Sequence, residues 1–296
     1  MMTLMQAVTG SGQLISTTRL RQLGHSRHSI RQHLQLGELV PICTGWVGTR
    51  LAGRVSVLAV SLGGKLTGST ALASHGLWDA DDRRVHLLLP PKSNGATKPL
   101  LTPLEQFVAP RFPTGPVVRH WRNELVRDHT EPGWRASIVD ALRVVALSNP
   151  AEQFVASVDS CLHEGAMSAA ALPSLRVALP ARLRPLLDSC DGRAGSGLES
   201  ICRLRFARLG CRVEIQVRMP GIARSGRAGA VDFLLDGWLV IEVDGDEFHD
   251  AASDRLRNSV IVRLGYRWHR FGYAQVMHDW PAVEATVREL LRYPPP

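Results

Sequence analysis

Acidic residues stand inside apolar strand-like sequence between residues 231 and 249. The stretch VDFLLDGWLVIEVDGDEFH places Asp232, Glu242 and Asp244 among residues that otherwise predict a buried hairpin. An unpaired charge in such surroundings is costly. Carboxylates a few ångströms apart ionise comfortably only with a cation among them, and a hard divalent ion such as Mg²⁺ or Mn²⁺ takes oxygen ligands of this kind.

The register of the hairpin decides whether these carboxylates meet. A two-residue turn at 236–237 would pair Asp232 with Ile241 and direct Glu242 to the other face. A three-residue loop at 236–238, in which glycine absorbs a positive φ, would instead pair Asp232 with Glu242. We expect the three-residue loop, which also brings Asp244, two residues after Glu242, to the same face.

A divalent ion held by Asp232, Glu242 and Asp244 would suit metal-assisted phosphodiester hydrolysis, because the metal acidifies the attacking water and stabilises charge on the phosphate. The alternative is that these acids lie in water at strand ends or pair with arginines that follow in the sequence. The candidate arginines are Arg255, Arg257 and Arg270.

The surrounding pattern predicts a mixed sheet flanked by helices, an α/β class within a chain that is α+β overall. The Gly/Ser-rich segment at 189–197 is typical of a domain boundary. The elements expected after it are a helix at 198–209, a strand at 211–218, the hairpin at 229–245, a helix at about 252–264, a strand at 266–271 and a helix at 281–292.

Residues 1–55 predict a winged helix-turn-helix. Thr17 or Thr18 can cap a first helix, Ser26 can cap a second, and a short hairpin follows around residues 44–45. The apolar residues expected in the cores of the two helices are Leu20, Leu23, Ile30, Leu34 and Leu36, with Gly24 and Gly37 as breaks.

The second of these helices predicts a DNA-binding face. Residues 1–60 carry six Lys or Arg against one acidic residue, which favours phosphate binding. The residues expected to contact double-stranded DNA are Arg27, His28, Arg31 and Gln32, with Gln35 on the same face. The alternative is a solvated basic face that contacts protein.

Residues 56–188 predict a mixed α/β middle region. SIVDALRVVALS and PAEQFVASVDSCLHEGAMSAAAL are typical of helices, and RVHLLLPP is typical of a strand. Asp159 and His163 stand four residues apart on a predicted helix, and we expect them to be surface residues rather than metal ligands.

The last third of the chain resembles a nuclease family. GSGLES, AVDFLL, VIEVDGDEFH and DRLRNSVIVRLGYRWHRF are similar to the domain-of-unknown-function-559 group of the restriction-endonuclease-like, PD-(D/E)XK superfamily, akin to very-short-patch-repair endonucleases. The resemblance covers residues 195–293 and implies a nuclease domain over 195–296. It implies that Asp232 is the metal-binding Asp, Glu242 the following acid and Glu199 the acid on the first helix.

One departure from that family concerns its catalytic lysine. Asp244 occupies the position where many members carry this lysine, and residues 193–296 contain none. The candidates for a replacing cation or proton-transfer group are His249, Arg257 and Arg270, and Gln216 also matches the family pattern and could position water. His249 could act as general base or protonate the leaving oxygen; otherwise it is a capping or surface residue.

The first half has a resemblance of its own. LISTTRLRQLGHSRHSIRQHLQLGELVPICTGWVG is similar to the winged-helix domain of the AbiEi antitoxin family of abortive infection. GGKLTGSTALASHGLW and RVHLLLPP resemble its continuation. This resemblance makes a cognate toxin, or a repair or defence protein, a candidate partner.

Composition restricts the compartment. No apolar run approaches the roughly 20 residues of a membrane span, and the first residues lack a secretory pattern, so we expect a cytoplasmic protein without a membrane partner. The five cysteines are scattered without a C-x-x-C pair, and we assign them to packing.

Three functions compete. The first is a Mg²⁺- or Mn²⁺-dependent DNA endonuclease delivered by a winged helix, in phage defence or DNA repair. The second is a non-catalytic, antitoxin-like DNA-binding repressor with a degenerate nuclease fold. The missing lysine favours this second function. The third, an RNA nuclease, is disfavoured because no aromatic platform for base stacking stands out. The sequence leaves the oligomeric state open.

Overall fold

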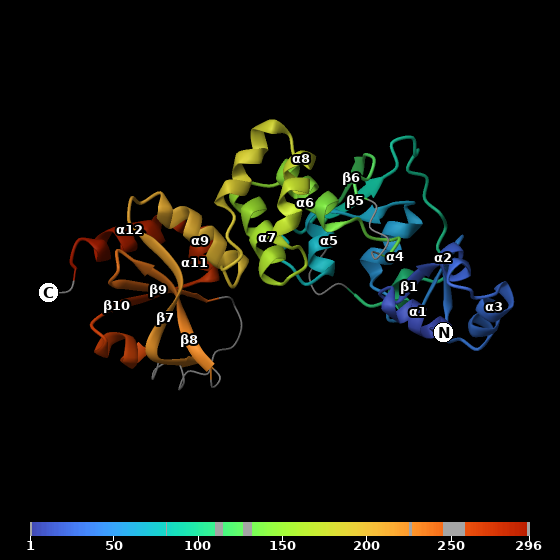
Figure 1. Cartoon of the computed structure of the whole chain (residues 1–296). Coiled ribbons are helices and arrows are strands. Elements are labelled where there is room, and N and C mark those ends of the chain that lie inside the picture. The colour runs from blue at the N-terminus through green and yellow to red at the C-terminus, as the bar shows by residue number, and fades with distance from the viewer. Residues whose placement is uncertain are drawn as a thin grey trace. The chain divides into compact units, whose positions relative to one another are not determined.

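The computed structural model describes residues 2–80, 82–109, 115–126, 132–224, 227–244 and 258–294, with only the backbone described at 223–224 and 227–228. Within these residues the chain is mixed α/β, with three sheets. It divides into two compact units (Figure 1). The first unit holds residues 1–149 and 173–180, and the second holds 150–172 and 181–296.

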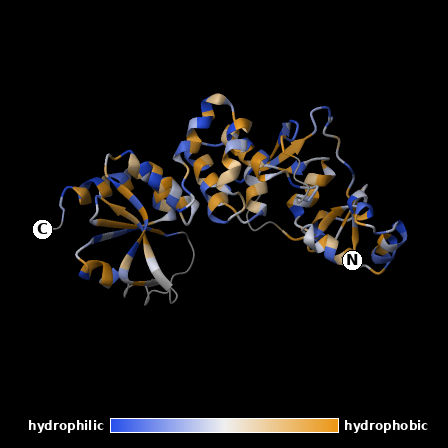
Figure 2. Cartoon of the chain, viewed as in Figure 1, coloured by the Kyte–Doolittle hydropathy of each residue, from blue (hydrophilic) through white to orange (hydrophobic). Residues whose placement is uncertain are grey.

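The first unit begins with three helices and a small sheet in which β3 lies between β1 and β2, antiparallel to both. These elements are α1 (Leu4–Gly10), β1 (Leu14–Ser16), α2 (Thr17–Gln22), α3 (Arg27–Gln35), β2 (Val40–Cys43) and β3 (Trp46–Gly48). Val8, Leu20, Ile30 and Val47 are buried together in one core cluster. Figure 2 shows that α3 is otherwise largely hydrophilic.

The predicted helix ends of this region are mostly confirmed. Ser26 caps α3, because its Oγ accepts a hydrogen bond from the backbone N of Ser29 at 3.0 Å. The cap of α2 is Ser16, one residue before the expected threonines, since its Oγ accepts from Arg19 N at 3.1 Å. The expectation for Leu36 was wrong. Leu36 lies at the C-cap of α3 and is 65% exposed, because the helix ends before it reaches the core.

The rest of the first unit contains a second sheet, in the order β4-β5-β6, and further helices. Its elements are α4 (Arg54–Ser61), β4 (Lys65–Leu66), α5 (Gly68–Ser74), β5 (Val85–Leu89), a 3₁₀ turn (Leu104–Gln106), β6 (Val117–Trp121), α6 (Ile138–Ser148) and α8 (Leu172–Ala178). The expected strand at RVHLLLPP and the expected helix at SIVDALRVVALS are confirmed as β5 and α6. All five residues of β5 are buried, as a continuous apolar run predicts.

The second unit is built around a four-stranded sheet in the order β10-β9-β8-β7. β7, β8 and β9 are antiparallel neighbours, and β10 runs parallel to β9. The elements are α7 (Ala151–His163), 3₁₀ segments (Ala169–Ala171 and Ala181–Ser189), α9 (Gly197–Ala207), β7 (Val213–Arg224), β8 (Arg227–Leu235), β9 (Leu239–Asp244), helical residues 258–263, β10 (Arg267–Gly272), α11 (Tyr273–His278) and α12 (Trp280–Leu291).

Both faces of this sheet carry apolar packing. Figure 1 shows α9, α11 and α12 together on one side of it, where Phe206 of α9 meets Phe233 edge-on at 5.2 Å between ring centroids. A second buried cluster includes Leu234, Val240 and Ile261. The strands predicted after residue 195 and the helices predicted at 198–209 and 281–292 are therefore found, with α11 as an unexpected addition. Of the helix expected at about 252–264, residues 258–263 are helical, and its first part lies outside the described residues.

Helix α7 belongs to the second unit. Asp159 on α7 is fully buried and pairs with Arg203 of α9 at 2.9 Å, and its other oxygen accepts from Asp191 N. The expectation of a surface position was wrong for Asp159 and right for His163, which is exposed. Burial outweighs the arginine pair and raises the pKa of Asp159. The chain passes between the two units at 149–150, 172–173 and 180–181, whereas a single break was expected at 189–197.

Two further expectations concern packing and membranes. Cys43, Cys161 and Cys202 are buried, and all five cysteines are free thiols, as expected of packing residues. Among the described residues, no helix has the length and apolar character needed to cross a bilayer.

Candidate functional site

The hairpin between β8 and β9 has the predicted three-residue loop. Phe233 pairs with Ile241, Leu234 with Val240 and Leu235 with Leu239. The loop therefore consists of residues 236–238, and Asp236 and Gly237 have φ of 49° and 80°. This register is confirmed, and it places Phe233, rather than Asp232, opposite Ile241.

Asp232 lies one step beyond the last backbone pair of this hairpin. Its Oδ2 accepts a hydrogen bond from the backbone N of Val243 at 2.9 Å. The Asp232 side chain thus accepts from a backbone N–H that would have bonded to a β8 carbonyl if the antiparallel pairing had continued. By the same register, Asp232 stands at the level of Glu242 on β9, so the hairpin positions these two carboxylates as neighbours.

Arg270 on β10 faces two of the acids. It pairs in register with Glu242, which is 3% exposed, on the neighbouring parallel strand. Its Nη2 lies 2.8 Å from Oε2 of Glu242, and its Nη1 lies 3.2 Å from Oδ2 of Asp244. The guanidinium lies 5.5 Å from the centre of the Trp268 ring, close enough for a cation–π contact. The alternative that these acids pair with an arginine is therefore found for Glu242 and Asp244.

Gln216 continues the row on β7. The pairs Ile215–Phe233 and Val217–Val231 flank it, which places Gln216 opposite Asp232. Its φ is 52°, a left-handed conformation that is uncommon for a residue other than glycine and costs about 1–3 kcal/mol. Strained backbone of this kind in mid-strand often re-aims a side chain beside a functional site.

Glu199 on α9 is held by three donors. Nε2 of Gln216 donates to its Oε2 at 2.7 Å, the backbone N of Gly195 donates to the same oxygen at 2.9 Å, and Ser196 Oγ donates to Oε1 at 3.1 Å. A Cβ on Gly195 would lie 3.0 Å from Oε1 of Glu199, so glycine permits this close approach. The acid is 8% exposed and has one fixed orientation.

The described site is thus a row across four strands, with one acid added from a helix. We call the set Gln216, Asp232, Glu242 and Arg270 the cross-sheet row, and Glu199 and Asp244 flank it. Sequence reasoning named all six residues. It offered Arg270 only as one of several candidate cations, and the structure shows that Arg270 pairs with Glu242 and Asp244. His249, Arg255 and Arg257 lie outside the described residues.

The fit to a divalent ion is mixed. Carboxylate oxygens on adjacent strands are suitable ligands for Mg²⁺ or Mn²⁺. In the part of the chain that the structure describes, however, no three His, Cys, Asp or Glu side chains form a group that could hold a metal ion. The expected triad of Asp232, Glu242 and Asp244 is not assembled as ligands there, because Arg270 and Val243 N engage these carboxylates. A divalent ion would have to compete with the guanidinium.

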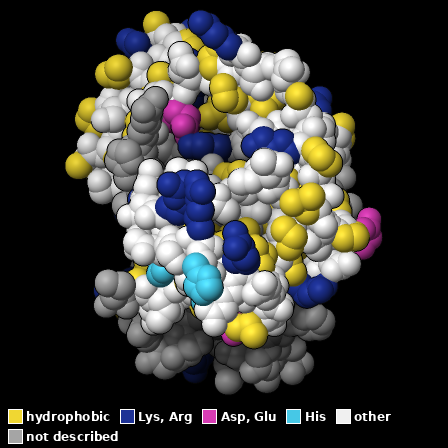
Figure 3. Space-filling model, turned by 90° about the vertical axis from the view of Figure 1, so that its right-hand side faces the viewer, with side chains coloured by type: hydrophobic (Ala, Val, Ile, Leu, Met, Phe, Trp, Pro, Cys, Tyr) yellow, Lys and Arg dark blue, Asp and Glu magenta, His cyan; other side chains and the backbone are white. Residues whose placement is uncertain are grey.

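The predicted nucleic-acid face lies in the first unit. Arg27, His28, Arg31 and Gln32 are exposed on α3, while Ile30 faces the core. Figure 3 shows Lys, Arg and His side chains close together on the surface at this end of the chain. The helix therefore presents a positive, hydrogen-bonding face with an apolar anchor behind it.

Neither the comparison with protein-family models nor the comparison with curated proteins finds a match for this chain. The function must therefore be argued from the residues themselves.

Proposed function

We propose that the chain is a metal-dependent DNA endonuclease in which the first unit binds double-stranded DNA and the second unit cleaves it. The observation that carries the proposal is the register of the hairpin, which sets Asp232 level with Glu242 in the middle of a sheet. Glu199, Asp232, Glu242 and Asp244 lie in or beside one row of side chains, and a bound cation would offset the repulsion among their charges.

Each site residue of the second unit has its own proposed role. Asp232 and Glu242 would hold Mg²⁺ or Mn²⁺, with Asp244 as a further ligand. Once bound, the ion supplies Lewis acidity and an acidified water. Gln216 keeps the Glu199 carboxylate in one orientation beside the row. We keep His249 as the proposed acid or base, on the resemblance to repair endonucleases.

Because the catalytic lysine of the family is missing, the positive charge must come from another residue. Arg270 can supply it. Its guanidinium already contacts Glu242 and Asp244, and arginine donors match phosphate geometry. If Glu242 and Asp244 were to hold a divalent ion, the Arg270 guanidinium would be available to bind a substrate phosphate. We also propose that the second unit has a restriction-endonuclease-like fold.

The first unit supports DNA as the substrate. Its helix, turn, helix and hairpin follow the order of a winged helix-turn-helix, and α3 would enter the major groove. The proposed contacts are those of Arg27, His28, Arg31 and Gln32. In line with the two resemblances, we propose a role in phage defence or DNA repair, with a toxin or a defence protein as a candidate partner.

Cleavage of supercoiled plasmid by the full chain tests this proposal. Wild type should nick or cut in Mg²⁺ or Mn²⁺ and stop in EDTA, and Asp232→Asn should lose activity at least 100-fold, because it removes a proposed metal ligand. Asp236→Asn is the matched control: Asp236 lies in the turn, and its Oδ1 only accepts from Arg212 N, a bond that asparagine can keep. Cleavage that survives EDTA, or equal cleavage by Asp232→Asn, would reject the proposal.

One observation favours a second function. Arg270 pairs with both Glu242 and Asp244, so that its positive charge offsets one of their two negative charges, as expected of a degenerate site retained for stability. The chain would then be a non-catalytic, antitoxin-like repressor. This second function predicts that the wild-type chain binds duplex DNA, does not cleave it in either metal, and protects a defined DNA site from nuclease digestion.

A further inference from the structure

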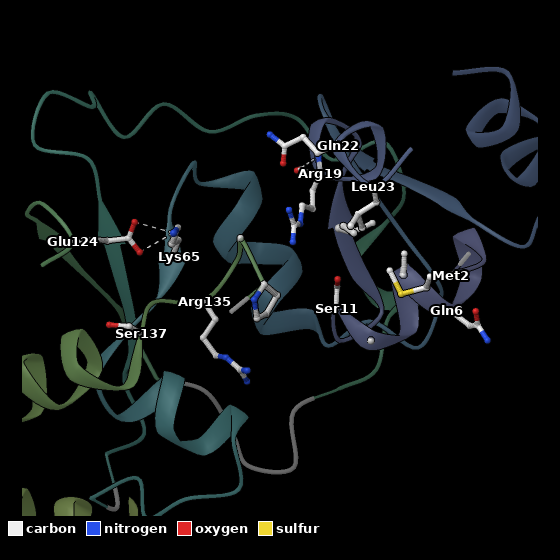
Figure 4. A pocket seen from close by; sticks show the side chains of 16 residues that line it. Met2, Gln6, Ser11, Arg19, Gln22, Leu23, Lys65, Glu124, Arg135 and Ser137 are labelled. Carbon is white, nitrogen blue, oxygen red and sulfur yellow. Dashed lines mark hydrogen bonds and ion pairs between the residues drawn. The ribbon is translucent and has the colours of Figure 1, made fainter. Parts of the chain in front are cut away.

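A cavity of about 500 Å³ lies in the first unit, which contains none of the residues of the cross-sheet row (Figure 4). Its walls come from α1, β1, α2, β4 and the described part of the segment before α6. A volume of 300 to 1,000 Å³ is typical of small-molecule sites. Nothing in the proposed DNA contact or cleavage uses this cavity.

The charged residues on the described walls leave an excess of two positive charges. Lys65 Nζ lies 2.7 and 2.9 Å from the two oxygens of Glu124, so this pair is neutral as a unit. Arg19 and Arg135 supply the remaining charge. Figure 4 shows Arg19 extending from α2, and Arg135 on the other side of the view with its guanidinium directed away from Arg19.

The two arginines differ in how firmly they are held. Arg135 donates from Nη1 to the carbonyl of Ser74 at 3.2 Å and stacks 5.1 Å from the Trp134 ring centre. Arg19 is exposed, and among the described residues its guanidinium has no hydrogen-bond partner. The cavity therefore offers one fixed cation and one that can adjust to an incoming anion.

The remaining lining of the cavity suits the organic part of a ligand. Ile15, Leu23 and Pro132 contribute apolar surface, and the side-chain amides of Gln6 and Gln22 contribute hydrogen-bonding groups. The lining is thus about evenly divided between polar and apolar groups, as a ligand with one charged part and one apolar part would require.

We propose that this cavity binds a small organic phosphate monoester of about mononucleotide size. A phosphate monoester carries −1.5 to −2 charges near neutral pH, which matches the positive excess of the cavity walls, with Arg19 as the adjustable donor. Guanidinium groups donate to phosphate in a bidentate geometry that a lysine cannot reproduce. The apolar walls would accept the base or another organic group.

The position of the cavity implies regulation of the DNA-binding helix. Arg19 belongs to α2, and Leu23, at the end of α2, packs against the core cluster that includes Ile30 of α3. A ligand that holds these residues would therefore bias the position of α3. This regulatory step rests on the proposed function, whereas the binding step does not.

Calorimetric titration of the full chain tests the binding step, with adenosine monophosphate, inorganic phosphate and uncharged adenosine as the probes. Adenosine monophosphate should bind at least tenfold more tightly than adenosine. Arg19→Gln should weaken it at least tenfold, the effect of losing one or two charge-assisted hydrogen bonds. Arg21→Gln is the matched control, because Arg21 is exposed on the same helix but does not line the cavity. It should change the affinity less than twofold.

A parallel measurement on a 20-base-pair duplex separates free phosphate from DNA phosphate. If neither adenosine monophosphate nor phosphate binds, and Arg19→Gln only reduces the salt dependence of duplex binding, the cavity takes DNA backbone and the small-ligand proposal is overturned. Equal binding of adenosine monophosphate by wild type and Arg19→Gln overturns it as well. Because neither titration measures cleavage, failure here is distinct from failure of the nuclease proposal.

Discussion

Arg270 and Glu242 stand at paired positions of the parallel strands β10 and β9, with Nη2 of Arg270 2.8 Å from Oε2 of Glu242. The side chain of Glu242 is 4% exposed, so its carboxylate has lost most of its contact with water. Removing one member of such a pair leaves a buried charge, which costs more than the pair contributes.

We therefore expect Arg270→Met to lower the free energy of unfolding by roughly 2–4 kcal/mol, measured by urea denaturation at neutral pH. The double variant Arg270→Met/Glu242→Gln should recover at least half of that loss, because it no longer leaves a buried carboxylate. A loss of less than about 0.5 kcal/mol in the single variant would show that the pair is energetically unimportant.

The strained residue Gln216 gives a second prediction. Gln216→Val should destabilise the second unit by about 1–3 kcal/mol, because a β-branched residue tolerates a φ of 52° poorly and cannot donate to Glu199. Urea denaturation measures this. Arg218→Val is the control on the same strand, at an exposed position without positive φ, and should stay within about 0.5 kcal/mol of wild type.

Much of the second unit could be predicted from the sequence because local signals determine it. The Asp236-Gly237 turn and the apolar run around Glu242 set the loop length, and the loop length set the register of Asp232. In the first unit, Ser26 and Gly24 marked the start of α3 and the turn before it.

Other features depend on contacts that no local pattern carries. The pairing of Arg270 with Glu242 requires the register of two strands separated by more than twenty residues. The left-handed backbone of Gln216 has no signal in its residue type. Asp159 was expected on the surface because its partner, Arg203, lies on another helix that the pattern of α7 alone cannot place beside it.

The basic face of α3 gives a third prediction. Replacing Arg27 and Arg31 together by Ala should weaken duplex binding and reduce its salt dependence by up to about one unit of slope per lost phosphate contact. Binding measured at several salt concentrations gives that slope. Arg119→Ala, an exposed arginine on β6, serves as the control and should leave the slope unchanged. An unchanged slope in the double variant would mean that α3 serves another partner.

A histidine pair in the first unit, with His86 buried and His120 partly buried, gives a pH prediction. His86 Nε2 lies 2.9 Å from Oδ2 of Asp82, and His86 Nδ1 lies 2.9 Å from Nε2 of His120. Burial, helped by the nearby His86, lowers the pKa of His120 to about 4 from an ordinary 6.5. The unfolded chain therefore binds more protons than the folded chain at mildly acidic pH, so stability should be full above pH 6.5 and fall as pH drops toward 4.

Thermal unfolding of wild type and His120→Gln between pH 7.5 and 4 tests this. The melting temperature of wild type should fall more steeply over this range than that of the variant, because glutamine has no proton to take up on unfolding. Parallel curves would contradict the assigned shift.

The most direct measurement of the central claim is Mn²⁺ binding to the folded chain, followed by electron paramagnetic resonance. The account predicts one site in wild type that Asp232→Asn and Glu242→Gln each abolish, and that Arg270→Gln tightens, because the guanidinium no longer competes for Glu242 and Asp244. Asp236→Asn should bind as wild type does. If the chain binds no Mn²⁺, or if Asp232→Asn and Glu242→Gln leave the binding unchanged, the assignment of a metal site to the acids of the cross-sheet row is contradicted.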